Sequence, residues 1–411
     1  MSDLFAELEW RGFIHHATQE IGTHLAADRR TVYCGFDPTA PSLQLGNLMP
    51  IMLLRHFQLA GHRPIVLMGG GTGLIGDPSG KRGERPLLSK EQIRENLHHQ
   101  RDQMARLLDF DGPAQALVLN NADWLVKQSL VDFLRDVGKH FSVNIMLQKE
   151  SVKARLDTGI SYTEFSYMLL QAYDFLHLFR ERQCTIQVGG SDQWGNITAG
   201  IDLIRRVESG EAHGLVAPLV TMASGAKFGK TEAGAIYLDP ALTSPYEFYQ
   251  FWRNADDRDV ERYLKLFTLK TADEIRAVMS AHSSNPGARA AQEALAKDIT
   301  SLVHGDKALA GVVQASAALF GEIAISTALE EHAPRRKVEV RPDTVVDALV
   351  QSGLTKSKSE ARRLIKQGGV YVNNRRVTDV DQQLLADDWV DGKKLLLRKG
   401  KKDYALLTVD G

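Results

Sequence analysis

The sequence predicts an α/β protein that opens with a Rossmann-like parallel-sheet domain and continues with an all-α domain and a small α+β domain. Three observations support this prediction. Short apolar runs alternate with helical patterns as far as about residue 220. Residues 245–330 lack strand signals and are rich in Ala, Leu, Glu and Lys. At 411 residues, the chain is also too long for one ordinary domain.

The N-terminal elements are expected to alternate along the chain. After an amphipathic helical lead-in over residues 1–30, the β-like runs are Thr31–Tyr33, Ile65–Met68, Ala116–Leu119, Thr185–Val188 and Leu215–Thr221. Helical patterns between them include Leu48–Ala60 and Ser89–Leu108, and Ser89 with Gln92 starts the second as a capping box. This alternation predicts a parallel sheet with helices on both faces.

The same patterns set the expected domain boundaries. These are 1–222 for the sheet domain with an insertion near 120–160, 223–244 for a loop and linker, 245–333 for the helical domain and 341–411 for the α+β module. The helical domain is opened by Ser244-Pro245 and broken at Asn285-Pro286-Gly287. A linker with the basic run Arg335-Arg336-Lys337 precedes the last module.

Composition and charge narrow the possible partners and compartment. Residues 341–411 carry 14 Lys and Arg against 10 Asp and Glu, a net +4, whereas residues 1–340 carry −5 of a total charge of −1. A basic module on an acidic body suggests nucleic-acid contact, although charge alone fits a solvated surface better. Cys34 and Cys184 fit neither a disulfide framework nor a metal site, and no apolar run reaches membrane-spanning length. With no signal peptide pattern, we expect a cytoplasmic protein.

The most informative stretch is Tyr33–Asn47, which reads Tyr-Cys-Gly-Phe-Asp-Pro-Thr-Ala-Pro-Ser-Leu-Gln-Leu-Gly-Asn. An apolar run ends in a Gly and Pro turn, a loop of small residues follows, and Asn47 leads into a helix. Strand, glycine turn and helix start are how α/β proteins present backbone N–H groups to phosphate. The stretch therefore predicts a nucleotide site.

A second glycine-rich loop, Gly71–Gly76, matches the dinucleotide pattern G-x-G-x-x-G after an expected strand. Asp77-Pro78 follows at once and does not suit a helix packed behind the loop, so a nicotinamide site rests on a weak match. We expect instead that the glycines let the backbone approach a ligand and that Asp77 pairs with an ammonium group. Lys81 and Arg85 would then be mobile cations for a polyphosphate.

Tyr167, Gln171 and Asp174 share one face of a helix because they lie at i, i+4 and i+7. A solvent-facing polar stripe would have this spacing too. The surrounding residues are apolar, however, and predict a mostly buried helix whose polar groups need partners. Asp174 would accept from a hydroxyl, and Gln171 and Tyr167 would hold an ammonium.

Two further loops carry candidate ligand groups. Gln187–Asn196 runs from a strand through Gly189-Gly190 to Asp192-Gln193, where Asp192 would take ribose hydroxyls, cap the next helix, or do both. Lys227-Phe228-Gly229-Lys230-Thr231 places two lysines three residues apart on a glycine-flanked loop. Such a loop suits a cationic lid over phosphates, although in isolation it would be an exposed basic loop.

In this order, the segments resemble those of the bacterial tyrosyl-tRNA synthetases, a class I family, over essentially all 411 residues. The resemblance implies tyrosine activation by ATP with Mg²⁺, no tightly bound metal or organic cofactor, transfer to tRNA(Tyr) and a homodimer whose interface lies around Trp124–Ser151. It places residues at the tyrosine (Tyr33, Asp77, Tyr167, Gln171, Asp174), at ATP or the adenylate (Gly35, Asp37, Thr39, Gly190, Asp192, Gln193) and at the leaving pyrophosphate (Lys81, Arg85, Lys227, Lys230, Thr231).

One segment departs from the family pattern. The family normally has His-Ile-Gly-His or a close relative where this chain has Gln44-Leu45-Gly46-Asn47, although the family does contain Asn at the last position. Gln44 keeps a side-chain donor but cannot carry a positive charge. Asn47 keeps a short donor and is a good N-cap. We expect a working site with a weaker electrostatic contribution to the first step.

The C-terminal stretch Ser357–Asn373 resembles the S-four type RNA-binding domain. Its helix carries Lys358, Arg362, Arg363 and Lys366, and a Gly turn and a strand follow. This predicts a basic surface for an RNA backbone. The remaining alternatives are an RNA-binding protein that has lost catalysis, supported only by Gln44 and Asn47, and a tryptophanyl-tRNA synthetase. The indole of tryptophan has no phenol for Asp174 to bind, and the tryptophanyl-tRNA synthetase family lacks this C-terminal module.

Overall fold

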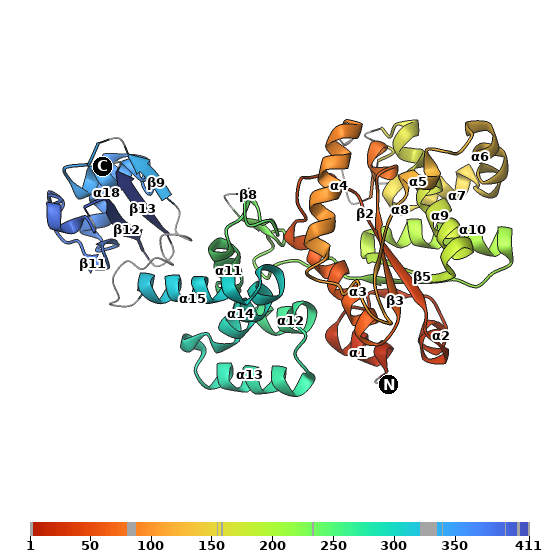
Figure 1. Ribbon diagram of the computed structural model, residues 1–411, viewed down its shortest axis with the longest axis horizontal. Coiled ribbons are helices and arrows are strands. Elements are labelled where there is room, and N and C mark those ends of the chain that lie inside the picture. The colour runs from red at the N-terminus through yellow and green to blue at the C-terminus, as the bar shows by residue number, and fades with distance from the viewer. Residues whose placement is uncertain are drawn as a thin grey trace. The chain divides into compact units, whose positions relative to one another are not determined.

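The computed structural model describes residues 3–79, 88–153, 155–157, 159–231, 234–320, 335–338, 340–390, 392–400 and 403–409. The chain forms two compact units. The first comprises residues 1–243 and 252–303, and the second comprises residues 244–251 and 304–411. Each unit contains a β-sheet and helices (Figure 1).

A six-stranded sheet in the order β1-β6-β5-β2-β3-β4 forms the centre of the first unit. Its strands are β1 (His16–Ala17), β2 (Thr31–Phe36), β3 (Arg63–Met68), β4 (Leu117–Asn120), β5 (Cys184–Gly190) and β6 (His213–Ala217). Strands β2 to β6 pair in parallel, as the alternating sequence pattern predicts. The chain leaves β2 toward β3 and β4 and then returns to β5 on the other side of β2, so the order in which strands are added reverses between β2 and β5.

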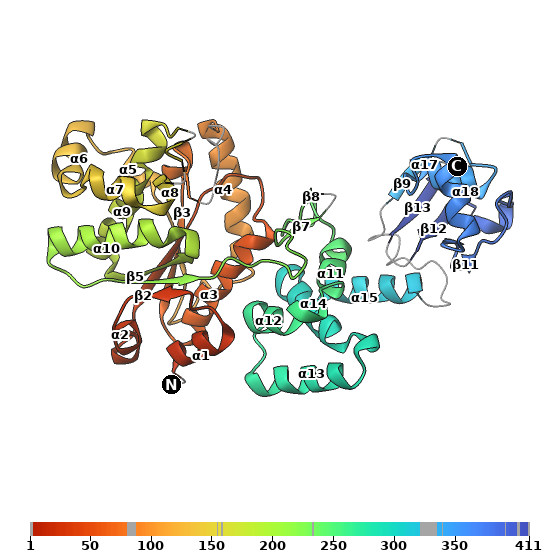
Figure 2. The ribbon, with the colours of Figure 1, turned by 180° about the vertical axis from the view of Figure 1, so that it is seen from behind.

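Helices cover both faces of this sheet (Figures 1 and 2). Helix α3 (Leu48–Leu59) packs on β2 and β3, whereas α9 (Tyr162–Arg182) and α10 (Trp194–Glu208) pack on β5 and β6. The other helices of the sheet region are α1 (Leu4–Arg11), α2 (Ile21–Ala27), α4 (Lys90–Met104), α5 (Ala122–Leu125), α6 (Leu130–Asp136), α7 (Val143–Gln148) and α8 (Glu150–Lys153). The Ser89–Gln92 capping box opens α4 as predicted.

The structure differs from the sequence pattern at the sheet edge. The lead-in over residues 1–30 contains β1 between its two helices, and β1 pairs antiparallel to β6 through His16 and Val216. Two residues carry too little periodicity for a strand signal. The last run, expected to reach Thr221, ends at Ala217 because Pro218 follows, and proline has no backbone N–H for a sheet ladder.

Helices follow the sheet domain, as predicted for residues 245–330. They are α11 (Pro245–Arg253), α12 (Asp257–Phe267), α13 (Ala272–Ser284), α14 (Ala290–His304) and α15 (Asp306–Phe320). The predicted break at Asn285-Pro286-Gly287 is a short 3-10 turn between α13 and α14. Helices α12 and α13 belong to the first unit with the sheet.

The second unit contains a five-stranded sheet in the order β11-β10-β12-β13-β9. Its elements are β9 (Arg335–Val338), α17 (Val345–Gln351), α18 (Lys358–Lys366), β10 (Val370–Val372), β11 (Arg375–Arg376), β12 (Lys394–Lys399) and β13 (Asp403–Val409). The basic run Arg335-Arg336-Lys337, expected in a linker, is strand β9 and pairs in parallel with β13. Edge strands often carry charged residues, and three consecutive basic residues lack the alternation of apolar and polar residues that would have predicted a strand.

Candidate active site

A pocket of about 940 Å³, a volume that includes open solvent, lies where the strand order reverses between β2 and β5. It is lined by the carboxyl ends of β2 and β5, by the loop after β3 and by α9. Parallel α/β sheets bind their ligands at such a switch point, because the loops diverge there and leave a crevice. The topology therefore selects this pocket as the candidate active site.

Asp174 is the most deeply placed acid of the pocket, with 2% of its surface exposed. Its carboxylate accepts from the amide of Asn121 at 2.8 Å and from the indole N–H of Trp124 at 2.7 Å. Both donors are neutral. Burial raises the pKa of Asp174 to about 8, while these two hydrogen bonds and the nearby Asp37 charge act in opposite directions on it.

Tyr33 lines the same pocket from β2 and is 1% exposed. Its ring packs edge-on against Phe175, with centroids 5.2 Å apart. Burial, followed by the Asp174 charge, raises the pKa of the Tyr33 phenol well above its ordinary value. Among the described residues its hydroxyl has no hydrogen-bond partner. A buried hydroxyl of this kind can be satisfied by a polar group of a ligand.

Asp77, Gln171 and Gln193 form a second polar group in the pocket. The Gln193 amide donates to Asp77 at 2.7 Å, and the Gln171 amide donates to the Gln193 carbonyl at 3.2 Å. Asn196 on α10 donates to Gln171 at 3.0 Å. The amide network fixes the carboxylate of Asp77, which is 7% exposed, so that it can accept from a cation in the pocket.

Tyr167 lies beside Asp37 in the pocket. Its hydroxyl donates to Asp37 at 2.9 Å, and the Thr72 hydroxyl donates to the other Asp37 oxygen at 2.8 Å. Gly69 makes room for this carboxylate, because a Cβ there would lie 2.0 Å from an Asp37 oxygen. The glycine after β3 therefore lets the backbone lie close to Asp37. The following loop contains only the 3-10 turn Thr72–Leu74 before Asp77, and no α-helix starts there as a dinucleotide-binding loop would require.

The segments Gln44–Asn47 and Lys227–Thr231 contact each other. The Lys230 ammonium donates to the Gln44 carbonyl at 3.2 Å, and Asn47 caps the Gln44 backbone N–H at 2.8 Å. Backbone bonds from Ile236 to Gly229 and from Leu45 to Ile236, each 2.9 Å, join the two segments. The unusual Gln44 thus contacts the lysine that the resemblance assigns to pyrophosphate.

The structure brings most of the predicted site residues together. Those that line the pocket are Tyr33, Gly35, Asp37, Thr39, Asn47, Asp77, Tyr167, Gln171, Asp174, Gly190, Asp192 and Gln193. Gln44, Lys227 and Lys230 lie outside its lining, and Thr231 is in the short strand β7 (Lys230–Thr231). Lys81 and Arg85 lie outside the described residues. Asp192 does not cap α10, whose N-cap residue Gln193 makes no side-chain cap bond.

Sequence reasoning missed the residues that hold the pocket acids. Asn121 accepts from the Gly71 N–H at 2.7 Å and donates to both Thr72 and Asp174, so it joins the two halves of the pocket. Asn121 and Trp124 follow β4, at the same edge of the sheet as the ends of β2 and β3. An Asn directly after an expected parallel strand was the available signal.

Neither thiol offers a nucleophile. Cys34 lines the pocket, but burial and the Asp192 charge raise its pKa to about 12. The Cys184 thiol is also buried, and burial raises its pKa well above the ordinary value of a thiol. A thiolate is the reactive form, so both cysteines are inert at neutral pH. Within the described residues, no cluster of three His, Cys, Asp or Glu could hold a metal ion.

In the second unit, α18 presents the predicted basic residues. Lys358, Arg362, Arg363 and Lys366 are exposed, while Ala361 and Ile365 face the core. Lys358 forms an ion pair with Asp347 at 2.7 Å. The turn at Gly368, with φ +69°, and β10 follow as the pattern predicts. None of the helices in the described part of the chain is long and apolar enough to cross a membrane.

Comparison with known proteins identifies the class to which this fold and pocket belong. Residues 26–321 match the family model described as tRNA synthetases class I (W and Y), and residues 324–407 match the SYY-like C-terminal domain of tyrosine–tRNA ligase. The chain is therefore a class I aminoacyl-tRNA synthetase by family.

Individual relatives narrow the family. The chain is 51% identical over its whole length to the whole tyrosine–tRNA ligase of Roseiflexus castenholzii, and 52% identical to that of Bacillus caldotenax over 98% of this chain and 99% of the other. A crystal structure of a C-terminally truncated mitochondrial tyrosyl-tRNA synthetase from Aspergillus nidulans is 31% identical and superposes with a TM-score of 0.71, covering 78% of this chain and 95% of that one. The chain belongs to the tyrosine–tRNA ligase family.

Proposed function

We propose that this protein activates L-tyrosine with ATP, giving tyrosyl-adenylate and pyrophosphate, and then transfers the tyrosyl group to the 3′ end of tRNA(Tyr) for protein synthesis. The observation that carries the proposal is the pair formed by Tyr33 and Asp174, two buried polar groups in the switch-point pocket of a tyrosine–tRNA ligase relative. The ligand that satisfies both is an aromatic side chain with a terminal hydroxyl.

The tyrosine phenol would donate to Asp174 and accept from Tyr33. Its ammonium group would pair with Asp77, beside Tyr167 and Gln171. The amide network over Asp77 supports this role because it orients the carboxylate before the substrate arrives. Phenylalanine would leave the Tyr33 hydroxyl without a partner and would offer no hydroxyl to Asp174, and an unpaired buried polar group costs about 1–3 kcal/mol.

ATP would bind on the other side, with its ribose at Asp192 and Gln193 and its adenine and phosphates along Gly35, Asp37, Thr39 and Gly190. The tyrosine carboxylate attacks the α-phosphate in line, and pyrophosphate leaves. Lys227, Lys230 and Thr231, with Lys81 and Arg85, would stabilise the negative charge on the leaving group, and Gln44 and Asn47 would donate to phosphate. Mg²⁺ would arrive as part of the nucleotide substrate.

Catalysis would then depend on positioning and electrostatic stabilisation. The inert thiols of Cys34 and Cys184 support a direct transfer without a covalent enzyme intermediate. In the second step, a ribose hydroxyl at the end of the tRNA attacks the adenylate. The exposed basic face of α18 supports a proposed contact of Lys358, Arg362, Arg363 and Lys366 with the tRNA backbone.

A cytoplasmic homodimer is the proposed state of the protein. Exposed apolar side chains on α6 and α7 support an interface in the insertion, among them Leu130 at 73%, Val131 at 71% and Val143 at 58%. Several large apolar residues so exposed in one segment mark an interaction surface.

One assay tests the function directly. ATP–pyrophosphate exchange measured with each of the twenty amino acids should respond to tyrosine, and Lys230→Ala should slow the exchange about a hundredfold, the usual effect of one lost phosphate donor. Exchange with tryptophan in place of tyrosine would assign the chain to the other amino acid of its family. No exchange with any amino acid would favour an RNA-binding protein without catalysis.

A further inference from the structure

Residues 221–231, here called the lysine loop, carry Lys227 and Lys230 and begin with a closed turn. Thr221 pairs with Lys227 as an isolated antiparallel bridge, and the Gly225 N–H donates to the Met222 carbonyl at 2.8 Å. Gly225 has a φ of +79°, which glycine adopts without strain. Because Lys227 closes this turn, the position of the turn determines the position of the Lys227 backbone.

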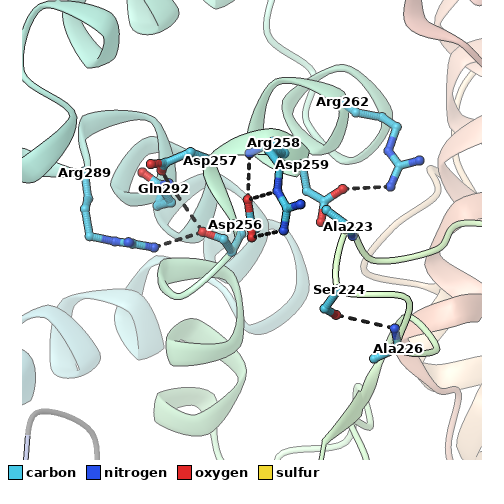
Figure 3. A network of polar contacts seen from close by, with 11 residues as sticks. Ala223, Ser224, Ala226, Asp256, Asp257, Arg258, Asp259, Arg262, Arg289 and Gln292 are labelled. Carbon is cyan, nitrogen blue, oxygen red and sulfur yellow. Dashed lines mark hydrogen bonds and ion pairs between the residues drawn. The ribbon is translucent and has the colours of Figure 1, made fainter.

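A buried acid of helix α12 contacts this turn. Asp259 is 4% exposed, and its carboxylate accepts from the Ala223 N–H at 2.7 Å and from the Arg262 guanidinium at 3.0 Å. Arg262 in turn donates to the carbonyl of Thr221. Figure 3 shows Asp259 between Ala223 and Arg262. One ion pair therefore holds both a donor and an acceptor of the turn.

The middle of the lysine loop is held by aromatic packing. The Phe228 ring stacks parallel on Phe267, with centroids 5.2 Å apart and planes 6° apart, and lies 5.4 Å from Tyr263 and 5.8 Å from Trp252. These three partners are fully buried. Phe228 stands between the two lysines in sequence, so its anchorage limits where both can reach.

Helix α12 is itself anchored at its other end. Arg11, on α1 and 3% exposed, donates to the carbonyls of Lys265 at 2.8 Å, Thr268 at 3.1 Å and Lys270 at 2.6 Å. The first two bonds satisfy carbonyls at the carboxyl end of α12, and the third holds the segment that follows the helix. The helix that holds the lysine loop is thus fixed to the body of the first unit.

We propose that Asp259, together with Phe228, is a positioning residue that sets the lysine loop over the nucleotide. Neither side chain touches substrate; both act through Lys227 and Lys230, and the inference rests on the proposed role of these lysines. A loop displaced by 1 Å misplaces its charges at the transition state, which costs far more than the lost contact suggests.

The test is a kinetic comparison in tyrosine-dependent ATP–pyrophosphate exchange. Asp259→Ala should lower kcat about tenfold and raise KM for ATP, and leave KM for tyrosine unchanged, because the tyrosine side of the pocket lies on β2, the loop after β3 and α9. Asp259→Asn keeps an acceptor for Ala223 and should recover part of kcat. Phe228→Leu should lower kcat less than Phe228→Ala.

Asp256→Ala is the matched control. Asp256 is the N-cap of the same helix and bonds to the Arg258 N–H at 2.9 Å and to its guanidinium at 2.8 Å (Figure 3). It should cost stability without changing kcat or KM for ATP. Equal losses of kcat in Asp256→Ala and Asp259→Ala, or a parallel rise of KM for tyrosine, would overturn the proposal. If Asp259→Ala does not fold, the same changes in kcat and KM for ATP are measured in Asp259→Asn and Phe228→Leu, and their absence in both variants would overturn the proposal.

The outcomes also separate this inference from the proposed function. If the unmodified protein shows no exchange, the function fails. If it exchanges but Lys230→Ala matches it, the role of the lysines fails. If Lys230→Ala is slow and Asp259→Ala is normal, the positioning role alone is wrong.

Discussion

Burial raises the pKa of Asp174 more than its two hydrogen bonds lower it, and its proton is therefore held more tightly in the folded chain than in the unfolded one. With the pKa raised from an ordinary 3.8 to about 8, the free energy of unfolding contributed by this group falls as pH rises from about 4 to about 8. An acid that recognises a hydroxyl here costs stability at neutral pH. Function and stability oppose each other at this residue.

Asp174→Asn should reveal that cost. The variant removes the titration, so its melting temperature relative to the native chain should rise between about pH 5 and about pH 8. Any misfit of the new amide with the Asn121 and Trp124 donors does not depend on pH and cancels in the comparison. A Tm difference that stays constant across this range would show that Asp174 titrates normally. Selectivity for tyrosine over phenylalanine should fall in the same variant.

Gln44 is the residue at which this chain departs from its family, and the structure gives it a partner in Lys230. Gln44→Ala should slow pyrophosphate exchange about three- to tenfold, because the exposed hydrogen bond from the Lys230 ammonium contributes about 1 kcal/mol. In a Lys230→Ala background the same substitution should cost much less, since the partner is already gone. Additive losses in the double variant would mean that Gln44 acts on phosphate independently of Lys230.

At the scale of elements, periodicity predicted the strands and helices that carry the pocket. The runs ending in Tyr33 and Val188 became β2 and β5, and the helix with Tyr167 and Asp174 became α9. Strand β1 and the charged strand β9 escaped because each is short and pairs at a distance in sequence. Asn121 was missed for the same reason, since its partners come from β3 and α9 and only the tertiary fold brings them near.

Helix α18 tests the proposed RNA contact. Arg362→Ala and Arg363→Ala should each weaken tRNA binding and lower its salt slope by about one, since each removes one phosphate contact. Pyrophosphate exchange should not change, because the first step needs no tRNA. Lys358→Ala should weaken tRNA binding less than either arginine variant, since Asp347 already pairs with that charge at 2.7 Å. Unchanged tRNA binding in both arginine variants would argue against an RNA contact on α18.

For the whole molecule, the exposed apolar side chains of the insertion have a direct consequence for assembly. Helix α6 has no buried residue in the single chain, although Leu130 and Val131 are among its first residues. A second copy of the chain would cover them. Burying two such side chains contributes several kcal/mol on the scale of about 25 cal/mol per Å² of apolar surface.

Light scattering of the native chain at micromolar concentration should therefore give twice the mass of one chain, and the double variant Leu130→Glu/Val131→Glu should give the monomer mass, since charges would be buried unpaired at the interface. Leu59→Glu is the matched control: Leu59 is 59% exposed at the end of α3, outside the insertion, and its substitution should leave the dimer intact. A native monomer, or dissociation by both changes alike, would place the interface elsewhere. Because α5 of the same insertion supplies Trp124 to Asp174, the double variant should also weaken tyrosine binding if assembly orders the pocket wall.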